Sequence, residues 1–300
     1  MSVRIGINPL SWTNDDMPEL GGDTPLETCL SEAREAGYAG IEMGHKFPRT
    51  YDALNPLLTA HRLRLVSGWY GSRLLERSAD DEITAVQGHL DLLSRMGANV
   101  MVFAEVTGSV HTERGIPLSA RPRLSDEDWP RFADALSRVA EHLAGAGVTM
   151  AYHHHMGTVV QSEEEIDRLM AASGSAVGLL LDTAHLVFAG GSPNDVIGRH
   201  GARINHVHCK DVRADELAHA RAADRSFLDS VLAGVFTVPG DGSLDFSSIL
   251  QALAELDYAG WLVVEAEQDP AKAHPLTYAR MGFEALSAHV ADAGLGRMEA

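Results

Sequence analysis

The chain has 300 residues, of which 45% are hydrophobic, and it carries a formal net charge of −18. This length and apolar fraction suit one α/β domain with an ordinary hydrophobic core. Because the strong negative charge would repel the phosphates of nucleic acids and anionic membrane surfaces, we expect neither a nucleic acid nor a membrane as partner.

Several features of the sequence favour a cytoplasmic location. The two cysteines, Cys29 and Cys209, are far apart and form no C-x-x-C motif, which is typical of a reducing compartment. The first residues, MSVRIGINPLSW, enter a strand-like run directly, without the charged and apolar regions of a signal peptide. Since no segment approaches about 18 uninterrupted apolar residues, we expect no transmembrane helix.

Short apolar runs alternate with longer amphipathic segments along the whole chain. The runs that predict strands are residues 3–8, 38–43, 63–69, 99–105, 148–153, 177–182, 204–209 and 261–266. Between them, residues 126–144 place apolar side chains at three- and four-residue steps, which predicts a helix. Eight such repeats predict a single-domain (β/α)8 TIM barrel over residues 1–300. A doubly wound open sheet is the alternative, but no G-x-G-x-x-G follows an early strand.

Capping patterns predict where several helices begin and end. An acidic residue follows three positions after Thr24, Ser125 and Ser162, as in a capping box. Pro25 would then occupy the first position of its helix. The glycines expected to end helices in the left-handed conformation are Gly37, Gly97 and Gly147.

Two connections are long and irregular. Residues 105–124 follow the fourth predicted strand, and residues 210–242 follow the seventh. Both would lie on the C-terminal face of a barrel, where long loops commonly carry function. We expect both to act as lids over a site there, and the second to contain a short helix.

Three of the last predicted strands end in side chains that bind metals. Asp182 ends the sixth strand, His208 the seventh and Glu265 the eighth. Singly, each has a structural explanation, as a turn cap, a core histidine and a surface carboxylate. Together they stand at equivalent ends of adjacent strands, which a parallel barrel brings to one face. Mixed carboxylate and imidazole ligands suit Mn, Co, Zn or Fe(II), so the pattern predicts a divalent metal site.

The fourth metal ligand is expected from the run of histidines that ends the fifth strand. Side chains alternate along a strand, so His153 and His155 share a face while His154 points the other way. His153 lies at the strand end and is the preferred ligand. His155 already lies in the turn and remains the alternative.

Residues at the ends of the first three strands are candidates for binding substrate. Asn8 and Trp12 follow the first strand, Glu42 and Lys46 follow the second, and Trp69 ends the third. Amide, carboxylate, ammonium and indole groups on one rim could hydrogen-bond a polyol and cover its apolar face. Either tryptophan could instead belong to the core.

Two further expectations concern titratable residues near the strand ends. His185 follows Asp182 by three positions and would point into the same cavity, as a substrate ligand or an acid–base group. Asp15, Asp16 and Glu19 are expected to form a solvated loop.

These motifs resemble a known superfamily. The stretches LDTAH, HVHCKD and GWLVVEAE are similar to the metal motifs of the xylose-isomerase-like barrels, which include sugar isomerases, ketose 3-epimerases and repair nucleases. More specifically, GINPLSWTNDDMPELGGD, AYHHHMGT and VPGDGSLDF resemble the inosose dehydratases of inositol catabolism. The resemblance implies a metal-dependent lyase that dehydrates 2-keto-myo-inositol (scyllo-inosose) to a trihydroxycyclohexane-1,2-dione. It also implies Mn or Co as the metal.

One position departs from the wider superfamily. Its isomerases and epimerases carry a glutamate at the end of the fifth strand, where this chain has histidine. This puts a two-glutamate proton relay in doubt and favours dehydration over the alternative, a sugar isomerase or epimerase with the same metal site. The negative charge argues against a nuclease. A further alternative is a non-enzymatic metal-binding module. It would need no enclosed polar rim around the ion and predicts several exposed sites instead of one deep site.

The expected reaction partner is a small cyclic keto-polyol, and the sequence does not predict the oligomeric state. The metal would act as a Lewis acid, and Glu265 or another rim carboxylate would remove a proton. His185 or His155 would serve as the acid because histidine titrates near neutral pH. Lys46 would bind ring hydroxyls or offset developing charge.

Overall fold

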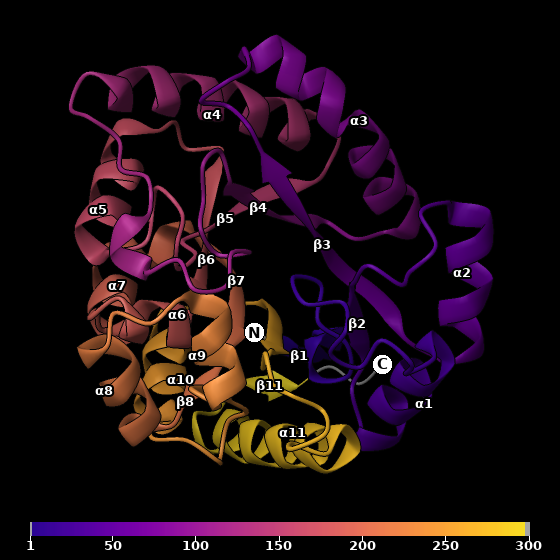
Figure 1. Ribbon diagram of the computed structural model, residues 1–300. Coiled ribbons are helices and arrows are strands. Elements are labelled where there is room, and N and C mark those ends of the chain that lie inside the picture. The colour runs from indigo at the N-terminus through magenta and orange to yellow at the C-terminus, as the bar shows by residue number, and fades with distance from the viewer. Residues whose placement is uncertain (1, 298–300) are drawn as a thin grey trace.

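The computed structural model describes residues 2–297, which fold around a closed barrel of eight parallel strands (Figure 1). The strands are, in order around the barrel, β1 (Ser2–Ile7), β2 (Gly40–Met43), β3 (Arg64–Ser72), β4 (Val100–Glu105), β5 (Thr149–His153), β6 (Val177–Asp182), β7 (Ile204–Cys209) and β10 (Gly260–Val264). The barrel closes because β1 pairs with both β2 and β10. The predicted (β/α)8 fold is confirmed, with a strand at each predicted run.

Helices surround the barrel and cover its outer face (Figure 1). They are α1 (Leu26–Ala36), α2 (Tyr51–Ala60), α3 (Ala79–Met96), α4 (Asp128–Gly145), α5 (Glu163–Ala172), α6 (Thr183–Phe188), α7 (Pro193–His200), α8 (Ala214–Ala222), α9 (Phe227–Ala233), α10 (Phe246–Glu255) and α11 (Pro275–Asp292). Short 3-10 helices are η1 (Pro9–Ser11), η2 (Leu118–Ala120) and η3 (Gly201–Arg203). Over residues 2–297, none of the helices has the length and apolar character needed to cross a membrane.

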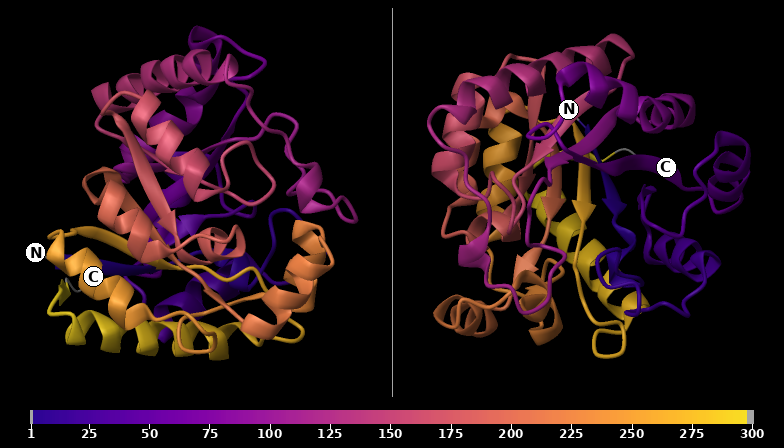
Figure 2. Two further views of the ribbon diagram at one scale, coloured as in Figure 1. Left: turned by 90° about the vertical axis from the view of Figure 1, so that its left-hand side faces the viewer. Right: turned by 45° about the horizontal axis from the view of Figure 1, so that its top comes forward.

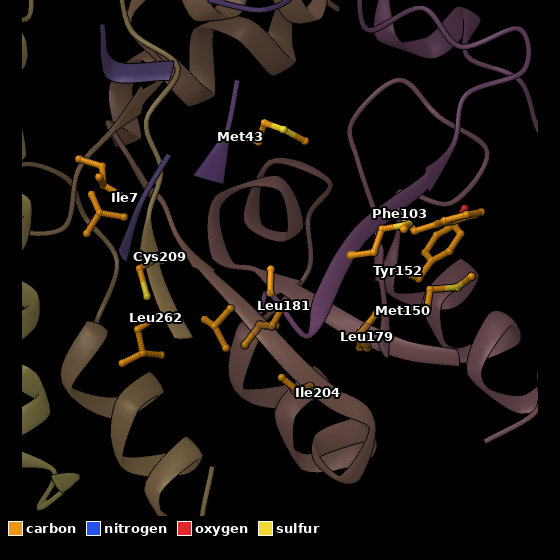
Figure 3. Packing of buried hydrophobic residues seen from close by; sticks show 14 of the residues in the cluster. Ile7, Met43, Phe103, Met150, Tyr152, Leu179, Leu181, Ile204, Cys209 and Leu262 are labelled. Carbon is orange, nitrogen blue, oxygen red and sulfur yellow. The ribbon is translucent and has the colours of Figure 1, made fainter. Parts of the chain in front are cut away.

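Side chains that alternate along each strand point either outward, into the apolar layer between strands and helices, or inward, toward the barrel interior and its polar mouth. Leu179 and Leu181 of β6 belong to the large apolar cluster that the helices cover (Figure 3). Leu180 instead packs with Val102 of β4 and Ala151 of β5 in a separate cluster. Side chains two residues apart share a face of a strand, so Asp182 continues the inward row of Leu180. The register then pairs Asp182 with His208 on β7, which brings two predicted ligands side by side.

Four of the predicted helix caps are confirmed. Ser162 begins α5 with a complete capping box, in which its side chain accepts from the Glu165 backbone and Glu165 reaches back. Gly37 and Gly97 end α1 and α3 in the left-handed conformation, with φ of 108° and 72°. Gly147 also has a positive φ of 79° and follows Ala146, the C-cap residue of α4.

The other two predicted caps, at the N-termini of α1 and α4, are wrong. Pro25 has an extended backbone with ψ of 146°, so it is the N-cap of α1 and the helix begins one residue later. Thr24 therefore lies outside the cap and caps nothing with its side chain. The Ser125 hydroxyl donates to the side-chain carboxylate of Asp128 (2.6 Å) and not to the helix backbone. The N-cap residue of α4 is Glu127.

Both long connections lie at the C-terminal end of the barrel (Figure 2). Residues 105–124 carry η2, and residues 210–242 carry both α8 and α9. The second connection also contains a small antiparallel ladder between β8 (Asp211–Val212) and β9 (Phe236–Thr237). The short helix expected in this connection is present, together with a second one, and the two helices pack on each other above the barrel.

The capping box of α5 predicts a measurable contribution to stability. We expect Ser162→Ala to lower the free energy of unfolding by about 1 kcal/mol, because the backbone N–H of Glu165 loses its acceptor. Ser125→Ala is the matched control and should change it by less than about 0.5 kcal/mol, because its side chain caps no backbone group. Urea unfolding of both variants checks this, and equal losses would contradict it.

Candidate active site

A pocket opens at the C-terminal end of the barrel. The predicted site residues that line it are Asn8, Glu42, Trp69, His153, His155, His208 and Glu265. They come from six different strands or the turns that follow them, as expected for a barrel whose parallel strands end at one face.

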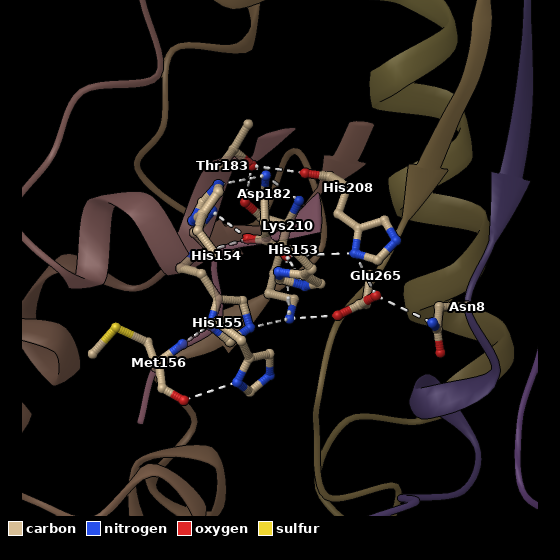
Figure 4. A network of polar contacts seen from close by, with 12 residues as sticks. Asn8, His153, His154, His155, Met156, Asp182, Thr183, His208, Lys210 and Glu265 are labelled. Atoms are coloured by element: carbon tan, nitrogen blue, oxygen red, sulfur yellow. Dashed lines mark hydrogen bonds and ion pairs between the residues drawn. The ribbon is translucent and has the colours of Figure 1, made fainter. Parts of the chain in front are cut away.

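Four buried side chains at the bottom of this pocket could hold a metal ion. His153, Asp182, His208 and Glu265 each offer a ligand atom, and these atoms lie within 4.8 Å of one another (Figure 4). Asp182 Oδ2 is 3.7 Å from His153 Nε2 and 3.6 Å from His208 Nδ1. His208 Nδ1 is also 2.8 Å from Glu265 Oε2. The structure thus brings together the four residues that the sequence proposed.

The two carboxylate oxygens of Asp182 have different surroundings. Oδ1 accepts from the backbone N–H groups of Ala184 (3.0 Å) and His185 (2.8 Å) and so caps α6. Oδ2 is buried and accepts no hydrogen bond within residues 2–297. A buried oxygen without a donor is costly unless a cation compensates it. Because Oδ2 points toward two imidazole nitrogens, the donor set fits a divalent transition metal.

Glu42 holds His208 in the orientation that such a site requires. The Glu42 carboxylate lies 3.2 Å from His208 Nε2 and 2.8 Å from His206 Nε2, and it accepts from the Ser67 hydroxyl at 2.6 Å. Although burial alone would raise it, the neighbouring imidazoles hold the pKa of Glu42 well below its usual range. With Nε2 directed at Glu42, His208 presents Nδ1 to the ligand cluster.

Asn8 connects the carboxylates of Glu42 and Glu265. Its side-chain NH2 donates to Glu42 (2.7 Å) and to Glu265 (3.1 Å), while its oxygen accepts from the backbone of Leu10. Asn8 and Glu42 therefore line the pocket, but their hydrogen-bonding groups are largely engaged by the protein.

Lys210 neutralises the carboxylates from behind the pocket, a role that the sequence did not reveal. Its ammonium group is fully buried, 2.5 Å from Glu265 Oε1, 2.8 Å from Glu267 Oε2 and 3.6 Å from Asp182 Oδ2. Burial alone would lower the pKa of Lys210, but these three carboxylates raise it. The available signal was its place in HVHCKD, two residues after the inward-facing His208.

The run of histidines alternates as expected. His153 and His155 line the pocket, whereas His154 turns away and its Nε2 accepts from the backbone N–H of Asp182 at 3.3 Å. The ligand group that includes Asp182 contains His153 and not His155. His155 places Nδ1 2.8 Å from the Met156 carbonyl oxygen, which assigns its proton to Nδ1 and leaves Nε2 as an acceptor. Burial holds the pKa of both pocket histidines well below the usual range.

Trp12 and Lys46 do not line the pocket, contrary to expectation. Trp12 is fully buried in the core and donates its indole N–H to Glu32 at 2.6 Å. Lys46 directs its ammonium group to the carbonyl oxygens of Gly21, Gly22 and Thr24. Both side chains follow a strand end, but Glu32 engages Trp12 and the loop of residues 12–24 engages Lys46 before a substrate could.

His185 also lies behind the pocket and does not line it. The backbone N–H of Met156 donates to its Nδ1 at 3.1 Å, and Lys210 Nζ is 3.0 Å from its Nε2. Phe227 and Phe236 of the long second connection stack on its ring. Its ring centroid is 4.0 Å from that of His155, so His185 supports His155 instead of facing substrate directly.

Four titratable residues line the pocket that were not assigned to it from sequence. His111 comes from the first long connection, Asp15 and Asp16 from the loop after β1, and Glu267 from the segment after β10. Burial, together with the neighbouring Asp15, raises the pKa of Asp16 to about 7. Burial also raises the pKa of Glu267, against the opposing effect of Lys210. The expectation of a solvated loop is therefore wrong for Asp16.

Comparisons with known proteins agree with this architecture. The model of the xylose isomerase-like TIM barrel family matches residues 30–289. Rhizopine catabolism protein MocC of Rhizobium meliloti is 55% identical over 294 residues, which cover 98% of this chain and 90% of that protein. An inosose dehydratase of Geobacillus thermodenitrificans is 45% identical over 279 residues, 92% of this chain and 94% of that enzyme.

Among solved structures, that of L-ribulose 3-epimerase superposes with a TM-score of 0.68 and covers 97% of this chain and 96% of that one. At 18% sequence identity, this likeness shows the fold alone. The family model spans most of the chain, and two curated relatives match nearly its whole length. The chain therefore belongs to the xylose isomerase-like TIM barrel family.

Proposed function

We propose that the protein is a metal-dependent inosose dehydratase, a hydro-lyase of inositol catabolism. Its substrate would be 2-keto-myo-inositol (scyllo-inosose) and its product a trihydroxycyclohexane-1,2-dione. The observation that carries the proposal is the 45% identity to an inosose dehydratase over 92% of this chain. The pocket supports it, because buried metal ligands lie beside carboxylate and imidazole groups that can move protons.

The proposed metal ligands are His153, Asp182, His208 and Glu265. Mn or Co is favoured by the resemblance to inosose dehydratases, and the ligand types would also accept Zn. When bound, the ion would supply Lewis-acid polarisation of the substrate ketone. The cytoplasmic location expected from the sequence remains a prediction.

The remaining pocket groups suggest how the protein itself would act on a cyclic keto-polyol. Trp69 is 38% exposed and stands edge-on to His153 and His155, with ring centroids 5.6 Å apart in each case, so its indole can cover the ring of the substrate. His155 offers an unprotonated Nε2 to the C–H next to the ketone. Glu265 is committed to His208 and Lys210, which favours the role of ligand over that of acid or base.

The reaction type can be tested by the mass of the product. We expect the purified protein, supplied with Mn, to convert scyllo-inosose from a panel of inososes into a compound lighter by one water, with the new absorbance of a dione or its enol. Mass spectrometry and ultraviolet absorbance measure both. Conversion to an isomer of unchanged mass would support the sugar isomerase alternative and contradict dehydration.

The ligand set can be tested by removing one buried oxygen donor. Asp182→Ala should abolish Mn binding and dehydration together, because Oδ2 is lost from the centre of the cluster. Glu141→Gln, on the exposed face of α4, is the control and should leave both unchanged. Metal content after dialysis and turnover of inosose are the readouts. A fully active, metal-free Asp182→Ala protein would refute the metal site.

The role of Trp69 can be separated from that of the metal. We expect Trp69→Ala to raise KM for inosose about 10-fold, equivalent to about 1.4 kcal/mol of binding, because the ring of the substrate loses its aromatic cover. Trp69→Phe should recover most of this loss, and Mn affinity should be the same in both variants. An unchanged KM in Trp69→Ala would rule out the contact.

A further inference from the structure

The loop of residues 12–24 has a fixed shape, although its sequence is polar. The buried side chain of Asn14 accepts from the backbone N–H groups of Asp16 (2.9 Å) and Met17 (2.7 Å). Asp15 accepts from both the backbone and the imidazole of His45, at 3.2 and 2.7 Å. These bonds fix the backbone on both sides of Asp16.

Lys46 closes the other end of the loop. Its ammonium group donates to the carbonyl oxygens of Gly21 (3.1 Å), Gly22 (2.7 Å) and Thr24 (2.6 Å). Gly21 has a φ of +69°, and a Cβ there would lie 1.8 Å from the Trp12 carbonyl oxygen, so a side chain at this position is excluded. A loop tied at so many points can hold one side chain in a defined place at the pocket wall.

The loop presents two carboxylates to the pocket, Asp15 and Asp16, and that of Asp15 is already engaged by His45. Within residues 2–297 the carboxylate of Asp16 accepts no hydrogen bond and forms no ion pair. The pocket carboxylates of Glu42, Glu265 and Glu267 are, in contrast, bound to histidine or lysine. Asp16 therefore has its oxygens available for a substrate.

The charges around Asp16 suit a proton donor. Burial, Asp15 and Glu265 raise the pKa of Asp16, Lys210 lowers it, and the result is about 7. Glu267 is a fourth neighbouring charge, since Asp16 in turn raises the pKa of that carboxyl. A carboxyl group in this range carries a proton for much of the time at neutral pH.

The pocket histidines are poor alternatives as the acid. Burial lowers the pKa of His111 to about 4, so this histidine is neutral near pH 7. The Nδ1 proton of His155 is engaged by the Met156 carbonyl oxygen. His155 can accept a proton in the pocket but has none to give there.

We propose that Asp16 is the general acid of the dehydration, held at the pocket by a loop that Lys46 positions; this inference rests on the proposed function. His155 Nε2 takes the proton from the carbon next to the ketone, and the C–H electron pair forms the enolate. The enolate collapses to a C=C bond as the C–O bond of the β-hydroxyl breaks. The Asp16 carboxyl proton joins that oxygen, which leaves as water. Asp16 is then reprotonated and His155 deprotonated by solvent, so the atoms and charges balance.

Replacing Asp16 tests the acid role in the Mn-loaded enzyme. We expect Asp16→Asn to lower kcat for scyllo-inosose by about 10²- to 10⁴-fold, the usual contribution of a positioned acid, with Mn affinity unchanged. Asp23→Asn, an exposed residue of the same loop, is the control and should retain wild-type kcat. Asp16→Glu should recover part of the loss.

A change of leaving group separates proton donation from substrate binding. In an inosose whose departing hydroxyl is replaced by fluorine, fluoride can leave without a proton. Asp16→Asn should then eliminate fluoride at nearly the wild-type rate, whereas an equal loss on both substrates would overturn the proposal. A wild-type enzyme that dehydrates no inosose would instead refute the proposed function, so the two failures are distinguishable.

The pH profile supplies an independent readout. An acid must be protonated to act, so kcat of the wild-type enzyme should fall as pH rises above about 7. Asp16→Asn should lose this alkaline limb. If the limb persists in Asp16→Asn, it belongs to another group, with Glu267 the first candidate, and the assignment to Asp16 is wrong.

Lys46 is a positioning residue in this scheme, and its effect should pass through Asp16. Lys46→Met should lower kcat for scyllo-inosose and shift the alkaline limb, since the loop no longer holds Asp16 in one place. Added to Asp16→Asn, it should lower kcat little further. Fully additive losses would show that Lys46 acts independently of Asp16.

Discussion

Charge compensation at the mouth of the barrel is the constraint on which the site depends. Asp182, Glu265 and Glu267 are all buried within 3.6 Å of one ammonium group, that of Lys210. Buried carboxylates are tolerated only when paired, and here one cation serves all three. Lys210 leaves Asp182 Oδ2 facing His208 Nδ1 at 3.6 Å, so the arrangement that stabilises the fold also provides the site at which we propose that a divalent ion binds.

The barrel and the ligand cluster followed from simple rules of sequence. Continuous apolar runs marked all eight strands, because parallel strands in a barrel are buried on both faces. Asp182, His208 and Glu265 were found together because strand ends of a closed barrel share one face. The alternation of His153 and His155 likewise needed only the two-residue period of a strand.

The rest of the site depends on contacts between distant segments, which local patterns do not encode. Lys46 and Trp12 follow strand ends, as pocket residues do, but the loop of residues 12–24 and Glu32 engage them first. Asp16 was expected in solvent because its neighbours are polar; Asn14 and Lys46 turn that polar segment into a folded loop. Lys210 shows its role only once β6, β7 and β10 lie side by side.

The central claim is that a divalent ion joins the ends of β5, β6, β7 and the segment after β10. A crystal structure of the Mn-loaded protein, with anomalous scattering recorded to locate the metal, tests it most directly. We expect one strong peak bound by His153 Nε2, Asp182 Oδ2, His208 Nδ1 and Glu265, at metal–ligand distances of about 2.0–2.3 Å. A peak centred instead on His185 and Glu267, or no peak in this cluster at saturating Mn, would contradict the claim.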